Sequence, residues 1–128
     1  MHGILRMRTL LLTLCFVLTA CSPSIFEESN CSNQLISSTA SANGQFVASL
    51  IRRDCGATAA YSNLVFLKRS GDTTGKDGPW GENIYASQGE MPIALEWYGS
   101  ELRIEAPTMG KDVFLKRDNW TDVRIVYK

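Results

Sequence analysis

Apolar and polar residues alternate most regularly between residues 93 and 105, and this alternation predicts a β-hairpin. Apolar side chains stand at every second position of its two strands: Ile93, Leu95, Trp97, Leu102 and Ile104. Gly99-Ser100 separates the strands and suits a two-residue type II′ turn, because glycine readily takes the positive φ that this turn requires. The turn pairs Trp97 with Leu102 and places Glu96 opposite Arg103 as a charge pair. A shift of one residue would break both pairings.

Five other segments have the composition of β-strands. They are residues 45–51, 64–67, 83–87, 113–115 and 123–127. In the first, apolar residues occupy both sets of alternate positions from Phe46 to Ile51, which predicts a strand that is covered on both faces. We expect the last two segments to pair with each other through residues 117–121. This number of short strands favours an antiparallel sheet folded as a small sandwich or open barrel.

Residues 25–36 form the one expected helix. Ile25, Phe26, Leu35 and Ile36 are its apolar residues, and the acidic pair Glu27-Glu28 suits a first helical turn. Residues 37–44 are small and polar, so we expect a loop there. The predicted fold class is therefore mainly β, with one short N-terminal helix.

The first 20 residues have the pattern of a secretory signal peptide. Arg6 and Arg8 form a basic start, and the uncharged, largely apolar stretch that follows ends at Ala20. This stretch is shorter than the ~20 residues that a bilayer-spanning helix needs. Leu18-Thr19-Ala20-Cys21 resembles the lipobox of bacterial lipoproteins, in which a diacylglycerol is attached to the cysteine thiol before cleavage. The alternative is an ordinary secretory signal that leaves Cys21 as a free thiol.

The lipobox resemblance implies both an anchor and a location. In such lipoproteins the new amino terminus is usually acylated too, so Cys21 would carry two or three acyl chains. Labelled palmitate would be incorporated into these chains and would detect them. Two chains hold a protein stably on a membrane, whereas one holds it only marginally. Ser22 implies, by the same resemblance, the inner leaflet of the outer membrane, facing the periplasm. Residues 21–24 would then be a lipidated tether and residues 25–128 a single β-rich periplasmic domain.

Composition limits the classes of function. The chain has 13 basic and 13 acidic residues, and removal of Arg6 and Arg8 with the signal leaves 11 and 13, a net charge of −2. This balance argues against a nucleic-acid-binding protein, which has a basic surface. The hydrophobic fraction of 45% indicates a folded chain, and residues 21–128 suffice for one domain with a modest core.

Four cysteines are present, and the signal peptide and the lipid account for two of them. Cys15 leaves with the signal and Cys21 carries the lipid, so Cys31 and Cys55 remain as a pair in an oxidising compartment. A structural disulfide is favoured over a redox-active couple, because the Cys-x-x-Cys spacing is missing. Two cysteines without a histidine do not make a usual structural zinc site. We expect no metal and no cofactor.

The mature sequence gives little support to catalysis. The only histidine of the whole chain, His2, lies in the signal peptide, so the mature chain has none. Ser-His-Asp and Cys-His sites are therefore excluded. A carboxylate pair of the glycosidase kind stays open among several acidic residues: Glu82, Glu90, Glu96, Glu101 and Glu105. We expect no catalytic residues and a protein that is not an enzyme, with a carboxylate-based hydrolase as an alternative.

Arg53, Asp54 and Thr58 are candidate binding residues, because they surround Cys55 in a connection between two apolar strands. Either they contact a ligand, or the disulfide fixes a connection in which Asp54 pairs with an arginine and caps backbone amides. Gly56 can take a positive φ there.

Trp80 is the fourth candidate binding residue. It lies in a glycine-rich stretch, residues 70–83, that is long enough to be functional. Trp80 either caps the core from the sheet edge or is an exposed anchor for a partner, since tryptophan is enriched among interface hot spots.

The sequence Arg53-Asp54-Cys55-Gly56-Ala57-Thr58 resembles a family of small bacterial proteins, often lipoproteins, of unknown function. In that family a cysteine precedes a Ser-Pro-Asp-Gly-Lys-like turn, a strand leads to the motif, and a tryptophan-containing strand follows. Cys31, residues 41–45 and Leu95-Glu96-Trp97 match these features, over roughly residues 31–104. Two positions depart from the pattern, with Ala59 for a second Thr and Ala42-Asn43 for Pro-Asp. The resemblance implies the fold and the disulfide, and no activity.

These observations lead to one expected function and one further alternative. We expect a monomeric, non-enzymatic, lipid-anchored protein of the cell envelope that binds a protein or an envelope component and no nucleic acid. The further alternative is an inhibitor or immunity-type lipoprotein that blocks a secreted enzyme or toxin, for which a protruding Trp80 loop would be suitable.

Overall fold

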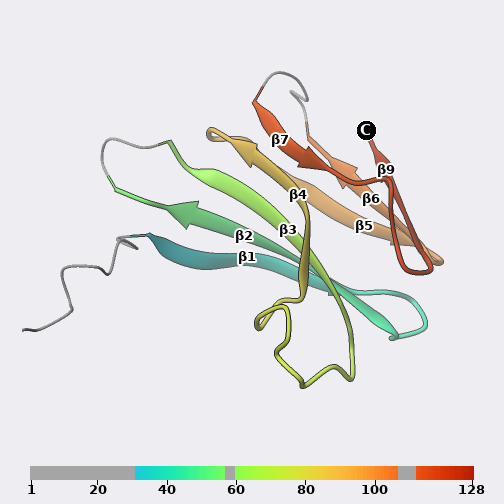
Figure 1. The fold of residues 1–128 in the computed structure, drawn as a ribbon. Coiled ribbons are helices and arrows are strands. Elements are labelled where there is room, and N and C mark those ends of the chain that lie inside the picture. Colours follow the sequence, from blue (N-terminus) through green and yellow to red (C-terminus); the bar gives the residue numbers. More distant parts are fainter. Residues whose placement is uncertain (1–30, 57–59, 107–111) are drawn as a thin grey trace, which may run out of the picture.

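Two open β-sheets make up the described part of the chain (Figure 1). The computed structural model describes residues 31–56, 60–106 and 112–128, and in these ranges it contains no helix, hence none able to span a membrane. The strands are β1 Ser32–Ala40, β2 Phe46–Asp54, β3 Ser62–Arg69, β4 Glu82–Gln88, β5 Ala94–Tyr98, β6 Glu101–Glu105, β7 Val113–Lys116, β8 Asn119–Trp120 and β9 Val123–Tyr127. The first sheet is antiparallel, in the order β1-β2-β3-β4-β7, and the second has the order β5-β6-β9-β8. The mainly β prediction is confirmed.

One apolar core lies between the two sheets. Both sheets contribute buried side chains to it: Phe46, Ala48, Leu50, Val65, Leu67, Ile84 and Tyr85 from the first, and Leu102, Ile104, Trp120, Val123 and Ile125 from the second. Phe46 of β2 is 2% exposed, and its ring centroid lies 5.9 Å from that of Trp120 and 6.4 Å from that of Trp97. Phe46 therefore joins the first sheet to both β8 and β5.

The strand β2 has buried side chains on both of its faces, as its continuous apolar run predicts. Leu50 is 5% exposed and belongs to the core, whereas its neighbour Ile51 is 0% exposed and lies outside the core cluster. Successive side chains of a strand point to opposite faces of the sheet, so Ile51 points away from the second sheet. Within the sheet, β1 and β3 pair with the two edges of β2.

The hairpin predicted between residues 93 and 105 is confirmed in its register. Strands β5 and β6 pair Leu95 with Ile104 and Trp97 with Leu102. Gly99 has a φ of +62°, and Ser100 is not among the residues with positive φ, which agrees with the type II′ turn rather than with type I′.

The predicted charge pair of this hairpin is wrong, although its register is right. Glu96 stands opposite Arg103 in the ladder, but Nε of Arg103 donates to Oε2 of Glu101 at 2.9 Å. Residues two apart in a strand lie on the same face, so Glu101 competes for the guanidinium from the same strand. This hydrogen bond to Glu101 raises the pKa of the Arg103 guanidinium above its ordinary value.

The expected N-terminal helix is wrong over the residues that the structure describes. The segment 32–40, expected as helix and then loop, is the strand β1, and residues 25–30 lie outside the described ranges. β1 pairs with β2 from Ser32 opposite Asp54 to Ala40 opposite Val47, with a bulge between Leu35 and Ser37. Local helix signals were weak in this segment, and pairing with a neighbouring strand overrides weak local propensity.

The expected pairing of the two last strands is also wrong. β7 pairs with β4 in the first sheet, whereas β9 runs parallel to β6 in the second. The connection between them contains the two-residue strand β8, which pairs with β9. Both segments were identified as strands from their alternation, but alternation does not say which neighbour a strand takes.

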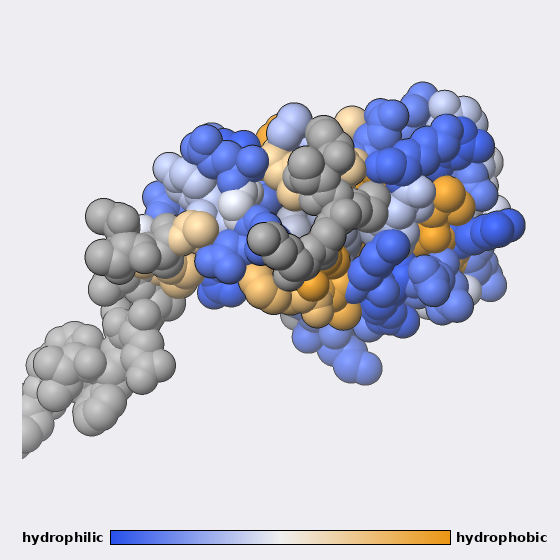
Figure 2. All heavy atoms as spheres, turned by 90° about the horizontal axis from the view of Figure 1, so that it is seen from above, coloured by the Kyte–Doolittle hydropathy of each residue, from blue (hydrophilic) through white to orange (hydrophobic). Residues whose placement is uncertain are grey.

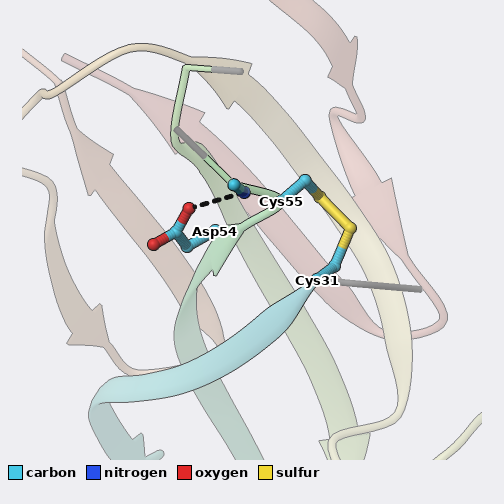
Figure 3. The surroundings of a disulfide bond; sticks show 4 residues. Cys31, Asp54 and Cys55 are labelled. Carbon is cyan, nitrogen blue, oxygen red and sulfur yellow. Dashed lines mark hydrogen bonds between the residues drawn. A yellow bond between two sulfur atoms is a disulfide. The ribbon is translucent and has the colours of Figure 1, made fainter. Parts of the chain in front are cut away.

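A disulfide closes the open end of the β1–β2 hairpin (Figure 3). The sulfur atoms of Cys31 and Cys55 are 2.05 Å apart. Cys31 directly precedes Ser32 and Cys55 directly follows Asp54, and these two neighbours form the last pair of the ladder. β1 is an edge strand whose side chains are almost all exposed. Because burial contributes little there, the disulfide and the backbone ladder hold β1 on the sheet. Two further bonds add to them: Nε1 of Trp97 donates to the Thr39 carbonyl at 3.0 Å, and the Ser38 and Ser49 hydroxyls are bonded at 3.3 Å.

Reduction of Cys31–Cys55 should therefore destabilise the domain and release β1. Closing a loop of this length contributes about 3.5 kcal/mol in the chain-entropy model, so the Tm should fall by about 10 °C or more. Calorimetry with and without reductant measures this change, and hydrogen exchange of residues 32–40 should rise on reduction. A Cys31→Ala/Cys55→Ala variant is the control, since its Tm should not respond to reductant. An unchanged Tm of the wild type would contradict the stabilising role.

Candidate functional site

The segment around the disulfide has the structure of a fixed connection. Oδ1 of Asp54 accepts a hydrogen bond from the backbone N–H of Gly56 at 3.0 Å (Figure 3). Gly56 has a φ of +112°, as predicted. In the described ranges Asp54 makes no ion pair with an arginine, so only the capping part of that interpretation is found. Thr58 lies outside the described residues, and Arg53 is exposed at the end of β2.

Trp80 is half-buried and packs on the first sheet. Its ring centroid lies 5.8 Å from that of Phe66 in β3, and the two planes are tilted by 48°. Just before it, the Pro79 carbonyl accepts a hydrogen bond from Nζ of Lys68 at 3.4 Å. Trp80 is outside the main core, so it is neither a core residue nor a freely protruding anchor.

Gly81 fixes this position of Trp80. Its φ is +94°, and a Cβ built on it would lie 2.2 Å from the Leu67 carbonyl oxygen and 2.6 Å from Cβ of Lys68. The backbone of the loop therefore approaches β3 more closely than any other residue type would allow. This close approach sets Trp80 against Phe66.

Trp80 and Phe66 lie on the face of the first sheet that points away from the core. The ladder registers place one residue from each strand in a row across this face: Leu35 of β1, Ile51 of β2, Leu64 of β3, Ala86 of β4 and Leu115 of β7. None of them belongs to the core cluster. Phe66, Val47 and Trp80 extend the row on one side. We call these eight residues the apolar face.

The apolar face is not a second closed core. Ile51 and Ala86 are buried, but Leu64, Leu115, Phe66, Val47 and Trp80 are only half-buried, and Leu35 is 51% exposed. The second sheet covers the opposite side of the first sheet, where the core lies. Among the described elements none forms a further layer on the apolar face. Partly exposed apolar residues gathered on one face make it a candidate contact surface.

Two cations and no carboxylate occupy the strand positions on this side of the described sheet. Arg53 pairs with Ser62 in a row beside Ile51, and Lys68 pairs with Val47 at the other end. The structure thus brings two of the candidate binding residues, Arg53 and Trp80, to one face, with apolar side chains between them. Asp54 is on the neighbouring position of β2 and so does not share that face.

The outer side of the second sheet is charged instead. Glu96, Glu105 and Arg124 are exposed there, together with the Glu101–Arg103 pair. The Arg103 guanidinium lies over the Tyr98 ring at 3.6 Å from its centroid, and a hydrogen bond to Glu96 raises the pKa of the Tyr98 hydroxyl. Figure 2 shows apolar residues gathered in patches among hydrophilic ones rather than spread evenly. The two outer sides of the protein therefore differ in chemistry.

A hollow of about 560 Å³ lies at one end of the second sheet and is lined by Pro92, Ile93, Ala94, Glu105, Ala106 and Lys128. Glu82, one of the acidic residues considered for hydrolysis, forms an ion pair with Arg117, and its carboxylate accepts a hydrogen bond from Nε1 of Trp120 at 2.6 Å.

In residues 31–56, 60–106 and 112–128, no three His, Cys, Asp or Glu side chains are grouped to hold a metal ion.

The substitution Gly81→Ala should displace Trp80 from the sheet. The added methyl would clash with the Leu67 carbonyl in addition to the strain of a positive φ, so we expect a loss of about 3 kcal/mol. Gly78→Ala is the matched control, because Gly78 has a φ of +86° but open space around its Cβ. It should cost only about 1 kcal/mol. Urea unfolding measures both losses, and equal losses would contradict the close approach at Gly81.

Comparisons with known proteins returned no match, since no family model, no curated protein and no solved structure is similar to this chain. The family resemblance of the Arg-Asp-Cys-Gly-Ala-Thr motif therefore stays a prediction, and the function has to be argued from the residues and their arrangement alone.

Proposed function

We propose that this protein is a lipid-anchored, non-enzymatic component of the bacterial cell envelope, and that its small β-sandwich domain binds an envelope component through the apolar face. The lipid would be attached at Cys21, and the domain would face the periplasm from the inner leaflet of the outer membrane. No cofactor is needed for this function.

The disulfide is the observation that carries the proposal. Cys31 and Cys55 are bonded across the end of the β1–β2 ladder, and such bonds persist in oxidising compartments such as the periplasm. The lipobox-like Leu18-Thr19-Ala20-Cys21 supports the same location independently. A chain with both features is exported and then held at a membrane.

The apolar face is the part of the domain best suited to binding. It combines exposed Leu35 with half-buried Phe66 and Trp80, and Arg53 stands beside it. The inhibitor alternative depends on a protruding Trp80, and the packing of Trp80 on Phe66 gives it no support. The hydrolase alternative gains nothing from Glu82, whose carboxylate is already bound by Arg117 and Trp120.

The substitution Cys21→Ser should abolish lipid attachment, because the thioether needs the thiol. Cells grown with labelled palmitate should label the wild type, and the variant should remain unlabelled and either unprocessed or soluble. Cys15→Ser is the matched control, since Cys15 lies within the signal peptide and should leave labelling unchanged. Label on the Cys21→Ser protein would contradict the anchor, as would a mature amino terminus at any residue other than 21.

A further inference from the structure

We propose that the apolar face rests on the surface of the bilayer itself and that its lipid partner carries anionic headgroups. The inference rests on the proposed lipid anchor and adds a second contact to it. The domain would then lie against the membrane on its first sheet, with the second sheet toward the periplasm.

The apolar face has the side chains that such a contact needs. Leu35 is 51% exposed at the rim formed by β1, and Phe66 and Trp80 are half-buried farther along the face. Tryptophan is enriched where protein meets the boundary between headgroups and acyl chains, because its ring is apolar and its N–H is polar. Gly81 holds this ring at the face of the sheet rather than in the core.

Charge decides between a lipid and a second copy of the chain. The strand positions around the apolar face hold Arg53 and Lys68 and no carboxylate. Two such faces stacked on each other would bring like charges together in a poorly solvated interface, which is unfavourable. Anionic headgroups, in contrast, attract basic residues near a membrane surface. The outer side of the second sheet carries glutamates among its cations and no apolar row, so it is less suited to the same contact.

The position of the anchor favours the same orientation. Residues 21–30 separate the lipidated cysteine from Cys31, and a segment of this length reaches at most about 36 Å. It joins the described chain at Cys31, immediately before β1. β1 is the edge of the sheet to which the apolar face belongs. The tether therefore keeps this sheet edge within about 36 Å of the bilayer, which permits the first sheet to rest on it.

Quenching of Trp80 by brominated lipids tests the contact. The acylated full-length protein is placed in vesicles of phosphatidylcholine and phosphatidylglycerol, with bromine on the acyl chains. We expect quenching of the wild type and its loss in Trp80→Phe, because the other two tryptophans, Trp97 and Trp120, lie between the sheets. High salt and vesicles of phosphatidylcholine alone should both weaken the quenching.

Matched variants test the two components of the face. Arg53→Gln/Lys68→Gln should lower the ratio of docked to undocked protein roughly 30-fold, at about fivefold for each cation. The control is Arg124→Gln/Lys128→Gln, which removes two exposed cations of the second sheet's side and should change little. Leu35→Glu should also reduce quenching, whereas Tyr98→Glu, at a residue of similar exposure on the second sheet, should not.

Three outcomes would overturn the proposal. Absence of Trp80 quenching in protein that carries labelled palmitate would reject docking and leave the anchor in place. Absence of palmitate would reject the anchor, and with it the docking that rests on it. A wild-type dimer that Leu35→Glu splits in sedimentation would show that a second copy, and not lipid, covers the face.

Discussion

The contact of Phe46 with the second sheet is the interaction on which the arrangement of the domain depends. Phe46 is nearly completely buried, and its ring meets Trp120 edge-on and stacks against Trp97. These two tryptophans come from β8 and β5, which stand at opposite edges of the second sheet. A single residue of β2 thus contacts both edges, and the Trp97 indole also binds the Thr39 carbonyl of β1. Truncation of an aromatic residue of this kind typically costs 3–5 kcal/mol.

One side of each sheet packs into this core, and the outer sides of the two sheets differ in the polarity of their side chains. The second sheet turns glutamates and arginines outward, as a sheet facing water does. The first sheet turns a row of apolar residues outward, from Leu35 to Leu115, between two cations. None of the residues in that row belongs to the core cluster. The row is therefore the surface for which we propose the membrane contact.

The sequence predicted individual strands and the local hairpin better than it predicted which strands pair with each other in the sheets. The β5–β6 hairpin was predicted to the residue, because the Gly99-Ser100 turn and the alternation specify the same register. β1 was missed, because Ser32 to Ala40 has little apolar patterning and is held by the ladder, the disulfide and Trp97. β7 and β9 were found as strands and wrongly paired, since alternation carries no information on long-range partners.

The candidate site shows the same limit. Arg53 and Trp80 were singled out separately, but their common face depends on registers between five strands that no local pattern contains. The one available signal was the apolar run from Phe46 to Ile51, which required cover on both sides of β2. Buried residues do lie on both sides of β2, and the second side is the apolar face, on which no described element forms a further layer.

Hydroxyl-radical footprinting tests the central claim, that the apolar face is the membrane-facing side of a lipid-anchored domain. Acylated protein on anionic vesicles is compared with the unacylated Cys21→Ser protein in buffer. We expect oxidation of Leu35 and Trp80 to fall several-fold on the vesicles, while oxidation of Tyr98 on the second sheet stays the same. Equal oxidation of Leu35 and Trp80 in both samples would contradict it, and so would equal protection of Tyr98.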